Sequence, residues 1–395
     1  MEEDGLKKSR VAEEWGKELS EQVHEDWIAA QALRKGIGLH HGRLPRSVSQ
    51  LNVSLFNAKK IRVLICTSSL IEGVNTVAEN IIILHNRVNN KKHDFFTFSN
   101  IKGRAGRMLQ HYVGRVFLFD EAPEPMNIEV EIPITDSNLR ESEDFLFDVD
   151  KEDLSTAQLS TVKTYCEAFE VSEACISRLM DYGLNTKEDI ETFKSDLKSY
   201  ADDPIGVNWE YPKYAQLKLA YEFIWSHMNF SKKGSRAGIR TASQATLLTF
   251  RLLSKNDIRS FLSSYIEGVP NFHLTNADAV EAGFQFLRAA EFTLPSALID
   301  LSYFIQTLLK NPVIDYSIYA IALENWFKKS TVQALEEYGI PYFISEKYED
   351  DLVDDNEISW NIKAVLKKMD ADGYFDKKNY LFLRNAFPRK YFENA

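Results

Sequence analysis

Three short apolar runs constrain the fold of this chain more than any other feature. They are IRVLICT from Ile61, NIIIL from Asn80 and GRVFLF from Gly114. Each run is apolar throughout rather than alternating, which is typical of parallel strands that are buried on both faces. Because helical patterns alternate with these runs, the sequence predicts an α/β domain over about residues 1–120. This domain should hold a parallel sheet with helices on both faces.

The remaining segments indicate where helices and connectors lie. Residues 1–36 are expected to be helical up to Gly36, and a further helix is expected to begin at Pro45. From Asp120 to Asp153 there are thirteen acidic and two basic residues, together with three prolines, which predicts a solvated connector over 121–153. A mostly α-helical region follows, which we divide into 154–268 and 269–395. Around residues 171–190 a winged-helix element and a plain helical bundle both fit the spacing.

Charge is distributed unevenly along the chain. The net charge is −11, but the segment from Arg34 to Phe119 holds fourteen lysines and arginines and three acidic residues. A basic block in an otherwise acidic protein indicates a local site for a polyanion rather than a generally adhesive surface.

Several classes of protein do not fit the composition. Hydrophobic residues make up 44% of the chain, which disfavours disorder, and no apolar run approaches the roughly 18 residues of a membrane span. The charged N-terminus lacks a signal peptide's apolar stretch. Because Cys66, Cys166 and Cys175 form neither a metal nor a disulfide pattern, we expect free thiols, a cytoplasmic location and no metal site made of cysteines.

Hydroxyl side chains follow the first apolar run. Thr67, Ser68 and Ser69 stand where a parallel strand would deliver its carboxyl end, the edge at which α/β sheets bind ligands. Hydroxyls and a helix start at that edge would hold phosphate oxygens. Farther on, Gly73 allows close backbone approach and Asn75 adds a polar amide. A strand followed by an ordinary capped helix remains the alternative.

The stretch GLHHGRLPRS precedes this edge by one helix. His40 and His41 have no third ligand nearby in the sequence, which disfavours a metal site. Together with Gly42 and Arg43, they fit the end of a strand that faces a sugar-phosphate backbone. A structural turn with incidental histidines is the alternative.

The stretch NIKGRAGRM carries the most specific pattern. Arg104 and Arg107 are three residues apart, so on a helix they would share one face, and Gly103 leaves that face accessible. Paired guanidinium groups suit a phosphate, and Asn100 lies just before them. A solvated basic helix would not need two glycines.

Taken together and in order, these stretches resemble the second RecA-like domain of superfamily-two helicases, in particular the superkiller-type DExH family. The resemblance covers about residues 34–119 and rests on HHGRLP, TSSLIEGVN and NIKGRAGR. Two departures stand out. Asn100 replaces the family's usual glutamine, and Arg43 adds a positive charge where HHAGLP is more usual.

This resemblance implies roles for the residues named above. Arg104 and Arg107 would be catalytic arginines that approach the γ-phosphate of ATP. The ATP site would also include Gly73, Asn75, Asn100 and Gly103, and the nucleic-acid groove would include His40, His41, Gly42, Arg43, Thr67, Ser68 and Ser69. The nucleic acid would be single-stranded or duplex DNA or RNA.

The family's other half-site would lie on a first RecA-like domain with a phosphate-binding loop and an acidic box that holds Mg²⁺. This chain contains no GxxxxGK[ST] stretch. The stretch FLFDEAP (Phe117–Pro123) resembles a DEAx box but lies downstream of the arginines, whereas the family's acidic box lies far upstream. ATP and Mg²⁺ are therefore expected only in a composite site with a first domain from missing sequence or another polypeptide.

Two interpretations remain open at this stage. In one, the chain is the C-terminal half of an ATP-dependent helicase, inactive alone, with a nuclease or other effector among its conceivable partners. A Hachiman-type antiphage-defence helicase is one such case. In the other, it is a non-catalytic helicase relic that binds nucleic acid or a protein. A membrane partner is expected in neither.

Overall fold

The computed structural model describes residues 9–67, 78–85, 87–88, 91–106, 113–124, 156–202, 212–268, 275–327, 335 and 358–372. The chain divides into two compact units. The first comprises Met1–Glu131, Ile266–Phe284 and Lys328–Ala395. The second comprises Ile132–Tyr265 and Gln285–Phe327.

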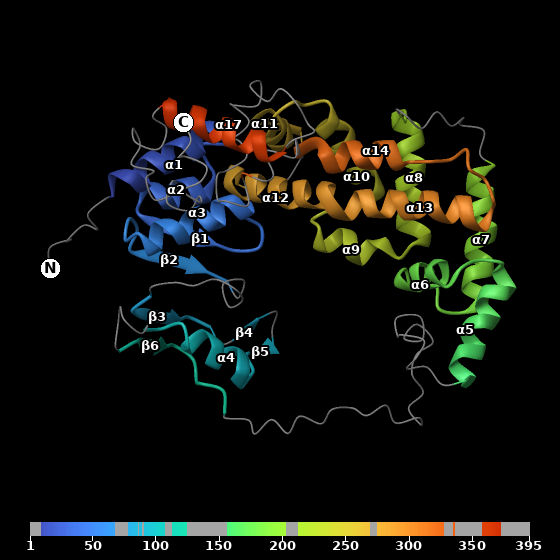
Figure 1. The fold of residues 1–395 in the computed structure, drawn as a ribbon, viewed down its shortest axis with the longest axis horizontal. Helices are drawn as coiled ribbons and strands as arrows, with labels where there is room; N and C mark the ends of the chain where they lie inside the picture. The colour runs from blue at the N-terminus through green and yellow to red at the C-terminus, as the bar shows by residue number, and fades with distance from the viewer. Residues whose placement is uncertain are drawn as a thin grey trace. The chain divides into compact units, whose positions relative to one another are not determined.

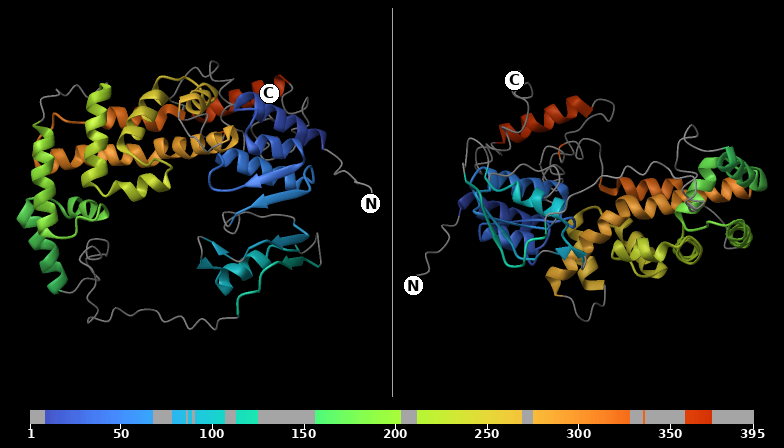
Figure 2. Two further views of the ribbon diagram at one scale, coloured as in Figure 1. Left: turned by 180° about the vertical axis from the view of Figure 1, so that it is seen from behind. Right: turned by 90° about the horizontal axis from the view of Figure 1, so that it is seen from below.

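The first unit begins with three helices and two strands: α1 (Arg10–Gln22), α2 (Ile28–Arg34), β1 (Ile37–His40), α3 (Arg46–Asn57) and β2 (Val63–Cys66). The two strands run parallel, with His40 opposite Cys66 at their carboxyl ends. Figure 1 and the left view of Figure 2 show α1, α2 and α3 lying together beside β1 and β2. The predicted strand at IRVLICT and the predicted helix after Pro45 are confirmed as β2 and α3.

The continuous helix expected over residues 1–36 is instead two helices, α1 and α2. The chain turns between them at His24–Asp26, where the Asp26 backbone N–H donates to His24 Nδ1 at 3.1 Å. The turn folds α2 back against α1, so closely that a Cβ on Gly16 would lie 2.8 Å from the Ala30 carbonyl oxygen. A glycine is therefore required for this helix pair to pack.

The rest of the first unit contains a second parallel pair, β3 (Asn80–Ile83) and β6 (Arg115–Leu118). Between them in sequence lie an antiparallel pair, β4 (Arg87–Val88) and β5 (Lys91–Lys92), and a helix, α4 (Phe95–Lys102). Figure 1 shows β3, β6 and α4 as neighbours. Farther along the chain, α17 (Ile358–Ala371) also belongs to this unit.

The α/β character and the parallel pairing are confirmed, but the pairs are smaller than the expected sheet. In the part of the chain that the structure describes, the parallel strands form two pairs, β1–β2 and β3–β6. Ile65 on β2 and Ile82 on β3 are 54% and 61% exposed. Helices α2 and α3 both contact β1, but these exposed side chains leave the expected helical cover of both faces incomplete among the described residues.

The second unit is helical throughout its described residues. Its elements are α5 (Thr156–Phe169), α6 (Glu173–Asp181), α7 (Lys187–Ala201), α8 (Tyr214–His227), α9 (Phe230–Arg236), α10 (Ala242–Leu253), α11 (Ile258–Gly268), η4 (Ala289–Thr293), α13 (Leu294–Leu308), α14 (Ser317–Glu324) and η5 (Asn325–Phe327). The last residues of α11 belong to the first unit, and α12 (Asn276–Arg288) runs from the first unit into the second. The expected α-helical C-terminal region is confirmed.

An aromatic core holds these helices together. Phe193 on α7 packs edge-on against Phe304 on α13 at 5.6 Å between ring centroids, and Phe223 on α8 lies 5.7 Å from Phe193. A half-buried polar pair accompanies this core, in which the Tyr182 hydroxyl donates to Asp300 Oδ2 at 2.8 Å. Burial and the Asp300 charge together raise the pKa of Tyr182, so this hydroxyl stays protonated and keeps donating.

Candidate functional site

The carboxyl ends of β1 and β2 bring two predicted site residues together. The Thr67 backbone N–H donates to the His40 carbonyl oxygen at 3.1 Å, which continues the parallel ladder one residue beyond the strands. The HHGR stretch and the hydroxyl stretch therefore begin side by side, as the position of ligand sites in α/β sheets led us to expect.

The turn after β1 has a defined shape. The Leu44 backbone N–H donates to the His41 carbonyl oxygen at 3.1 Å, and the Arg43 backbone N–H donates to His41 Nδ1 at 3.3 Å. Leu44 is buried and anchors the turn, whereas Gly42 and Arg43 are exposed. A Cβ added at Gly42 would meet no other atom within 4 Å, so the space above this glycine is open.

Interactions beneath the turn hold β1 in place. Asn52 on α3 donates from Nδ2 to the Leu39 carbonyl oxygen at 2.7 Å. A Cβ on Gly38 would lie 2.6 Å from Ile61 Cδ1, so the strand approaches its neighbours closely at this point. Neither Asn52 nor Gly38 was predicted to support the site, although both lie within 15 residues of it in sequence.

His40 differs from Arg43 in charge. Partial burial lowers the pKa of His40, and the neighbouring His41 lowers it further, so His40 is neutral at neutral pH. The permanent positive charge of this turn is therefore that of Arg43, which has the open position needed to meet an anion.

The second group of predicted residues lies at the end of α4. Asp94 caps the start of that helix by accepting a hydrogen bond from the Thr97 backbone N–H at 2.6 Å, a bond that lowers the pKa of the Asp94 carboxyl group. Asn100 is exposed on the last turn. The helix ends at Lys102, and Gly103 and Arg104 follow in a turn, with the Arg104 backbone N–H donating to the Ile101 carbonyl oxygen at 3.1 Å.

Gly106 in this turn packs directly against Gly114, the residue before β6. Gly106 has φ +76°, a left-handed conformation, and its backbone N–H donates to the Ala78 carbonyl oxygen at 3.0 Å. A Cβ on Gly106 would lie 2.7 Å from the Gly114 nitrogen, and one on Gly114 would lie 2.3 Å from the Ala105 carbonyl atoms. The two backbones therefore touch, and neither position has room for a side chain.

Arg104 does not lie on a helix, because α4 ends at Lys102 and Gly106 has a left-handed conformation. The shared helix face with Arg107 stays a prediction. Of the other predicted site residues, Ser68, Ser69, Gly73, Asn75 and Arg107 itself lie outside the described residues.

Two residues that support these two turns, Gly114 and Glu281, were not predicted from the sequence. Gly114 is the first residue of the predicted strand GRVFLF, and a glycine in that position was a usable signal of close backbone approach. Glu281 was not detectable, because its contact with His41, at 3.9 Å between Nε2 and Oε2, joins residues 240 positions apart.

Acidic residues after β6 do not assemble into a metal site in the described part of the chain. Asp120 and Glu121 of the DEAx-like stretch are exposed there. Across the described ranges, no three His, Cys, Asp or Glu side chains are grouped so that they could bind a metal ion.

None of the described helices is both long and apolar enough to span a bilayer.

Part of this chain is similar in sequence to known helicases. Residues 14–109 match the model of the helicase conserved C-terminal domain. Anti-bacteriophage protein B of Escherichia coli (strain K12) is 52% identical over 117 residues, which are 29% of this chain and 16% of that protein. The RQC trigger complex helicase SLH1 of Saccharomyces cerevisiae is 32% identical over 111 residues, 27% of this chain and 6% of that protein.

An archaeal protein aligns over a similar share of this chain. The ATP-dependent DNA helicase Hel308 of Pyrococcus horikoshii is 28% identical over 119 residues, 28% of this chain and 17% of that protein. The chain thus spans less than a fifth of the length of each of these relatives. The matches and the parallel-strand fold agree with one another: residues 14–109 of this chain form a region similar to the C-terminal domain of helicases.

Proposed function

We propose that this chain supplies the second RecA-like half of an ATP-dependent nucleic-acid helicase of the superkiller-type DExH class. The observation that carries the proposal is the bond between the Thr67 N–H and the His40 carbonyl oxygen. Thr67, the first residue of the hydroxyl stretch, thus lies beside the HHGR turn at one edge of a parallel pair, where an extended phosphate backbone would meet both.

The nucleic-acid role belongs to His40, His41, Gly42, Arg43, Thr67, Ser68 and Ser69. The exposed Arg43 guanidinium would pair with a phosphate, and the open space above Gly42 would admit the sugar-phosphate backbone. The excess of basic residues from Arg34 to Phe119 would attract either DNA or RNA without sequence preference.

The ATP role belongs to Arg104 and Arg107, supported by Gly73, Asn75, Asn100 and Gly103. The turn that holds Arg104 is fixed by the contact between Gly106 and Gly114, which suits an arginine that must meet a phosphate in a defined position. The phosphate-binding loop and the Mg²⁺ carboxylates would come from a first RecA-like domain, and closure of the cleft around ATP would move two nucleic-acid contacts relative to each other.

The 52% identity with Anti-bacteriophage protein B supports a role for the complete helicase in defence against bacteriophages. The proposal further assigns this helicase to the Hachiman type, to the cytoplasm and to a nuclease or other effector as a partner. Phage plating efficiency on cells that express the complete system would test this role. Arg104→Ala should abolish protection, and full protection by that variant would contradict it.

The nucleic-acid role is testable on the chain itself. A fluorescein-labelled oligothymidylate strand should bind weakly in fluorescence anisotropy, with an affinity that falls with salt at a slope of about −0.7 per phosphate contacted. Arg43→Ala and Thr67→Ala should both weaken binding. Thr67→Ala removes the hydroxyl but keeps the backbone bond to His40, so its effect would report the side chain.

Arg62 provides a matched control for Arg43. It is exposed and lies just before β2, at the amino end of the strand pair. Arg62→Ala removes the same charge and should reduce affinity less than Arg43→Ala. Equal losses would mean that only bulk charge matters, and salt-independent binding would favour the alternative of a non-catalytic protein-interaction module.

A further inference from the structure

The carboxylate of Glu281 on helix α12 lies 3.9 Å from His41 in the HHGR turn. We propose that Glu281 on α12 is a positioning residue that sets the tautomer of His41 and thereby the backbone of Arg43. The proposal rests on the nucleic-acid role of this turn given above, and it adds to that role a residue 240 positions away from His41 in the sequence.

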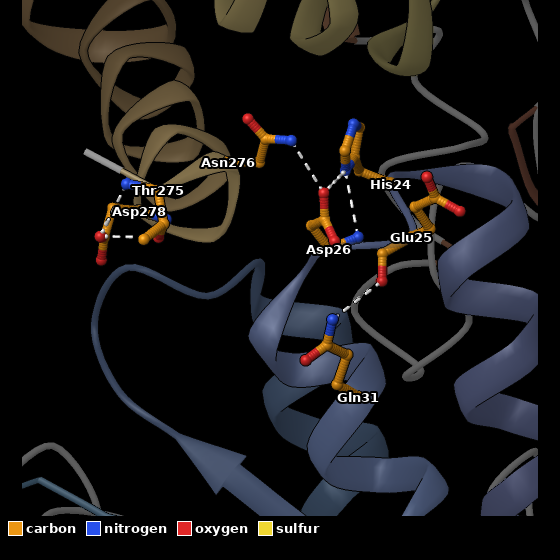
Figure 3. Close-up of polar contacts among 7 residues, drawn as sticks. All are labelled: His24, Glu25, Asp26, Gln31, Thr275, Asn276 and Asp278. Carbon is orange, nitrogen blue, oxygen red and sulfur yellow. Dashed lines mark hydrogen bonds and ion pairs between the residues drawn. The ribbon is translucent and has the colours of Figure 1, made fainter. Parts of the chain in front are cut away.

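Helix α12 is attached to the α1–α2 turn by several contacts within the first unit. Figure 3 shows Asn276 reaching Asp26, with 3.0 Å between Asn276 Nδ2 and Asp26 Oδ2. Asp26 in turn is bonded to His24 through its own backbone N–H. The ring of Phe284 lies 4.8 Å from that of Trp27, between centroids. These contacts bring residues 276–284 of α12 to the start of α2.

The start of α12 is itself well defined. Thr275 and Asp278 bond reciprocally: the Thr275 backbone N–H donates to Asp278 Oδ2 at 3.2 Å, and the Asp278 N–H donates to Thr275 Oγ1 at 3.2 Å. This capping arrangement fixes where the helix begins, and hence which residues of α12 face α2.

Glu281 uses its two carboxylate oxygens differently. Oε1 accepts a hydrogen bond from the indole Nε1 of Trp27 at 2.9 Å, and Trp27 is fully buried. Oε2 lies 3.9 Å from Nε2 of His41. The bond to the indole fixes the position of the carboxylate. Because the Glu281 side chain is only 12% exposed, water screens its charge less, and the charge acts more strongly on the imidazole.

The two ring nitrogens of His41 face different partners. Nδ1 accepts from the Arg43 backbone N–H at 3.3 Å, which requires that Nδ1 carry no proton. The proton of the neutral ring must then be on Nε2, the nitrogen that faces the Glu281 carboxylate. A negative charge on that side favours this tautomer, because it is attracted to the N–H dipole.

The effect on Arg43 follows from this assignment. With the proton on Nε2, His41 accepts the Arg43 N–H and holds the turn; with the proton on Nδ1, two N–H groups would face each other and the bond would be lost. Glu281 thus controls, through the imidazole, whether the residue that we expect to meet a phosphate has an ordered backbone.

Glu281→Gln isolates this effect. The glutamine carbonyl still accepts from Trp27 Nε1, so the packing of α12 is retained, but its amide N–H group then faces His41 Nε2 and favours the opposite tautomer. We expect oligothymidylate affinity to fall about threefold to tenfold, as for the loss of one net hydrogen bond. Simple charge removal predicts the opposite sign, because one acidic residue fewer should strengthen the binding of a polyanion.

Glu267 is the matched control. It is exposed near the end of α11, in the same unit, and Glu267→Gln removes the same charge. The full chain and both variants, labelled with ¹⁵N-histidine, would be compared by NMR, with the His41 signals assigned through His41→Gln. The wild type and Glu267→Gln should show a protonated Nε2, and Glu281→Gln should shift His41 toward a protonated Nδ1.

Equal tautomer populations in Glu281→Gln and wild type would overturn the proposal, whatever the affinities. So would a gain in affinity in Glu281→Gln that matches Glu267→Gln. Absence of oligothymidylate binding by the wild type would instead refute the proposed function, while the tautomer measurement would still test the contact. If Glu281→Gln fails to fold, Glu281→Asp, which withdraws the carboxylate by one methylene, should show a smaller shift in the same direction.

Discussion

The contact between Gly106 and Gly114 predicts a large effect for the smallest of substitutions. Gly106→Ala would place a methyl group 2.7 Å from the Gly114 nitrogen, in a residue with φ +76°. The left-handed conformation costs a non-glycine residue about 1–2 kcal/mol, and overpacking against backbone typically adds about 1–3 kcal/mol. We therefore expect Gly106→Ala to destabilise the packing of this turn against Gly114 by about 2–5 kcal/mol.

Gly103→Ala is the matched control, three residues earlier. Gly103 has helical angles, φ −63° and ψ −8°, and the nearest atom to an added Cβ is the Ser99 carbonyl oxygen at 3.3 Å. A glycine with compatible angles gains about 0.4–1 kcal/mol on replacement by alanine, through the unfolded chain. Gly103→Ala should therefore be neutral or slightly stabilising.

Two measurements would check this pair of variants. Urea denaturation followed by circular dichroism would report global stability, and hydrogen exchange at the amide of residue 106 would report the bond to the Ala78 carbonyl oxygen. Exchange should accelerate strongly in Gly106→Ala and remain unchanged in Gly103→Ala. If both variants exchange and unfold alike, the turn does not pack against Gly114, and the positioning that we assign to Arg104 loses its physical basis.

Three further predictions concern other parts of the molecule. Asp94→Ala should destabilise α4 at neutral pH, because the Thr97 N–H lowers the Asp94 pKa. That difference should be full above about pH 4 and should vanish as the pH falls through the lowered folded-state pKa, which urea titrations at several pH values would show. Tyr182→Phe should cost about 1–2 kcal/mol in the same assay, by removing the 2.8 Å bond to Asp300, and an unchanged midpoint would contradict it. The isolated chain should show no ATP turnover above background. In a complete enzyme, Arg104→Ala should reduce kcat by about 10³-fold with little change in single-strand affinity. A collapse of affinity at constant kcat would assign that arginine to the nucleic-acid groove.

Much of the local structure could be predicted from local patterns. The apolar runs at Ile61, Asn80 and Gly114 became β2, β3 and β6, because β-branched residues without polar alternation favour buried parallel strands. The helix after Pro45 became α3. The order of the three polar stretches also sufficed for the helicase family, since a family motif is a property of spacing along the chain.

Other features could not be read from those patterns. The segment 1–36 has continuous helical spacing, yet it bends at His24–Asp26 because burying Trp27 and packing α2 against α1 outweighs one longer helix. The end of α4 before Arg104 was missed for a similar reason, because the left-handed Gly106 is set by its contact with Gly114 and not by residues within the helix.

The sequence by itself determined which residues carry charge and hydrogen-bonding groups, and in what order they stand at the ends of the strands. Tertiary structure alone decided which distant groups act on them. Periodicity indicates that one face of α12 is buried, but it does not name the partner of that face. Only folding brings Glu281 within 3.9 Å of His41 and 2.9 Å of Trp27, because non-local contacts depend on how whole helices pack and not on the neighbours of a residue in the chain.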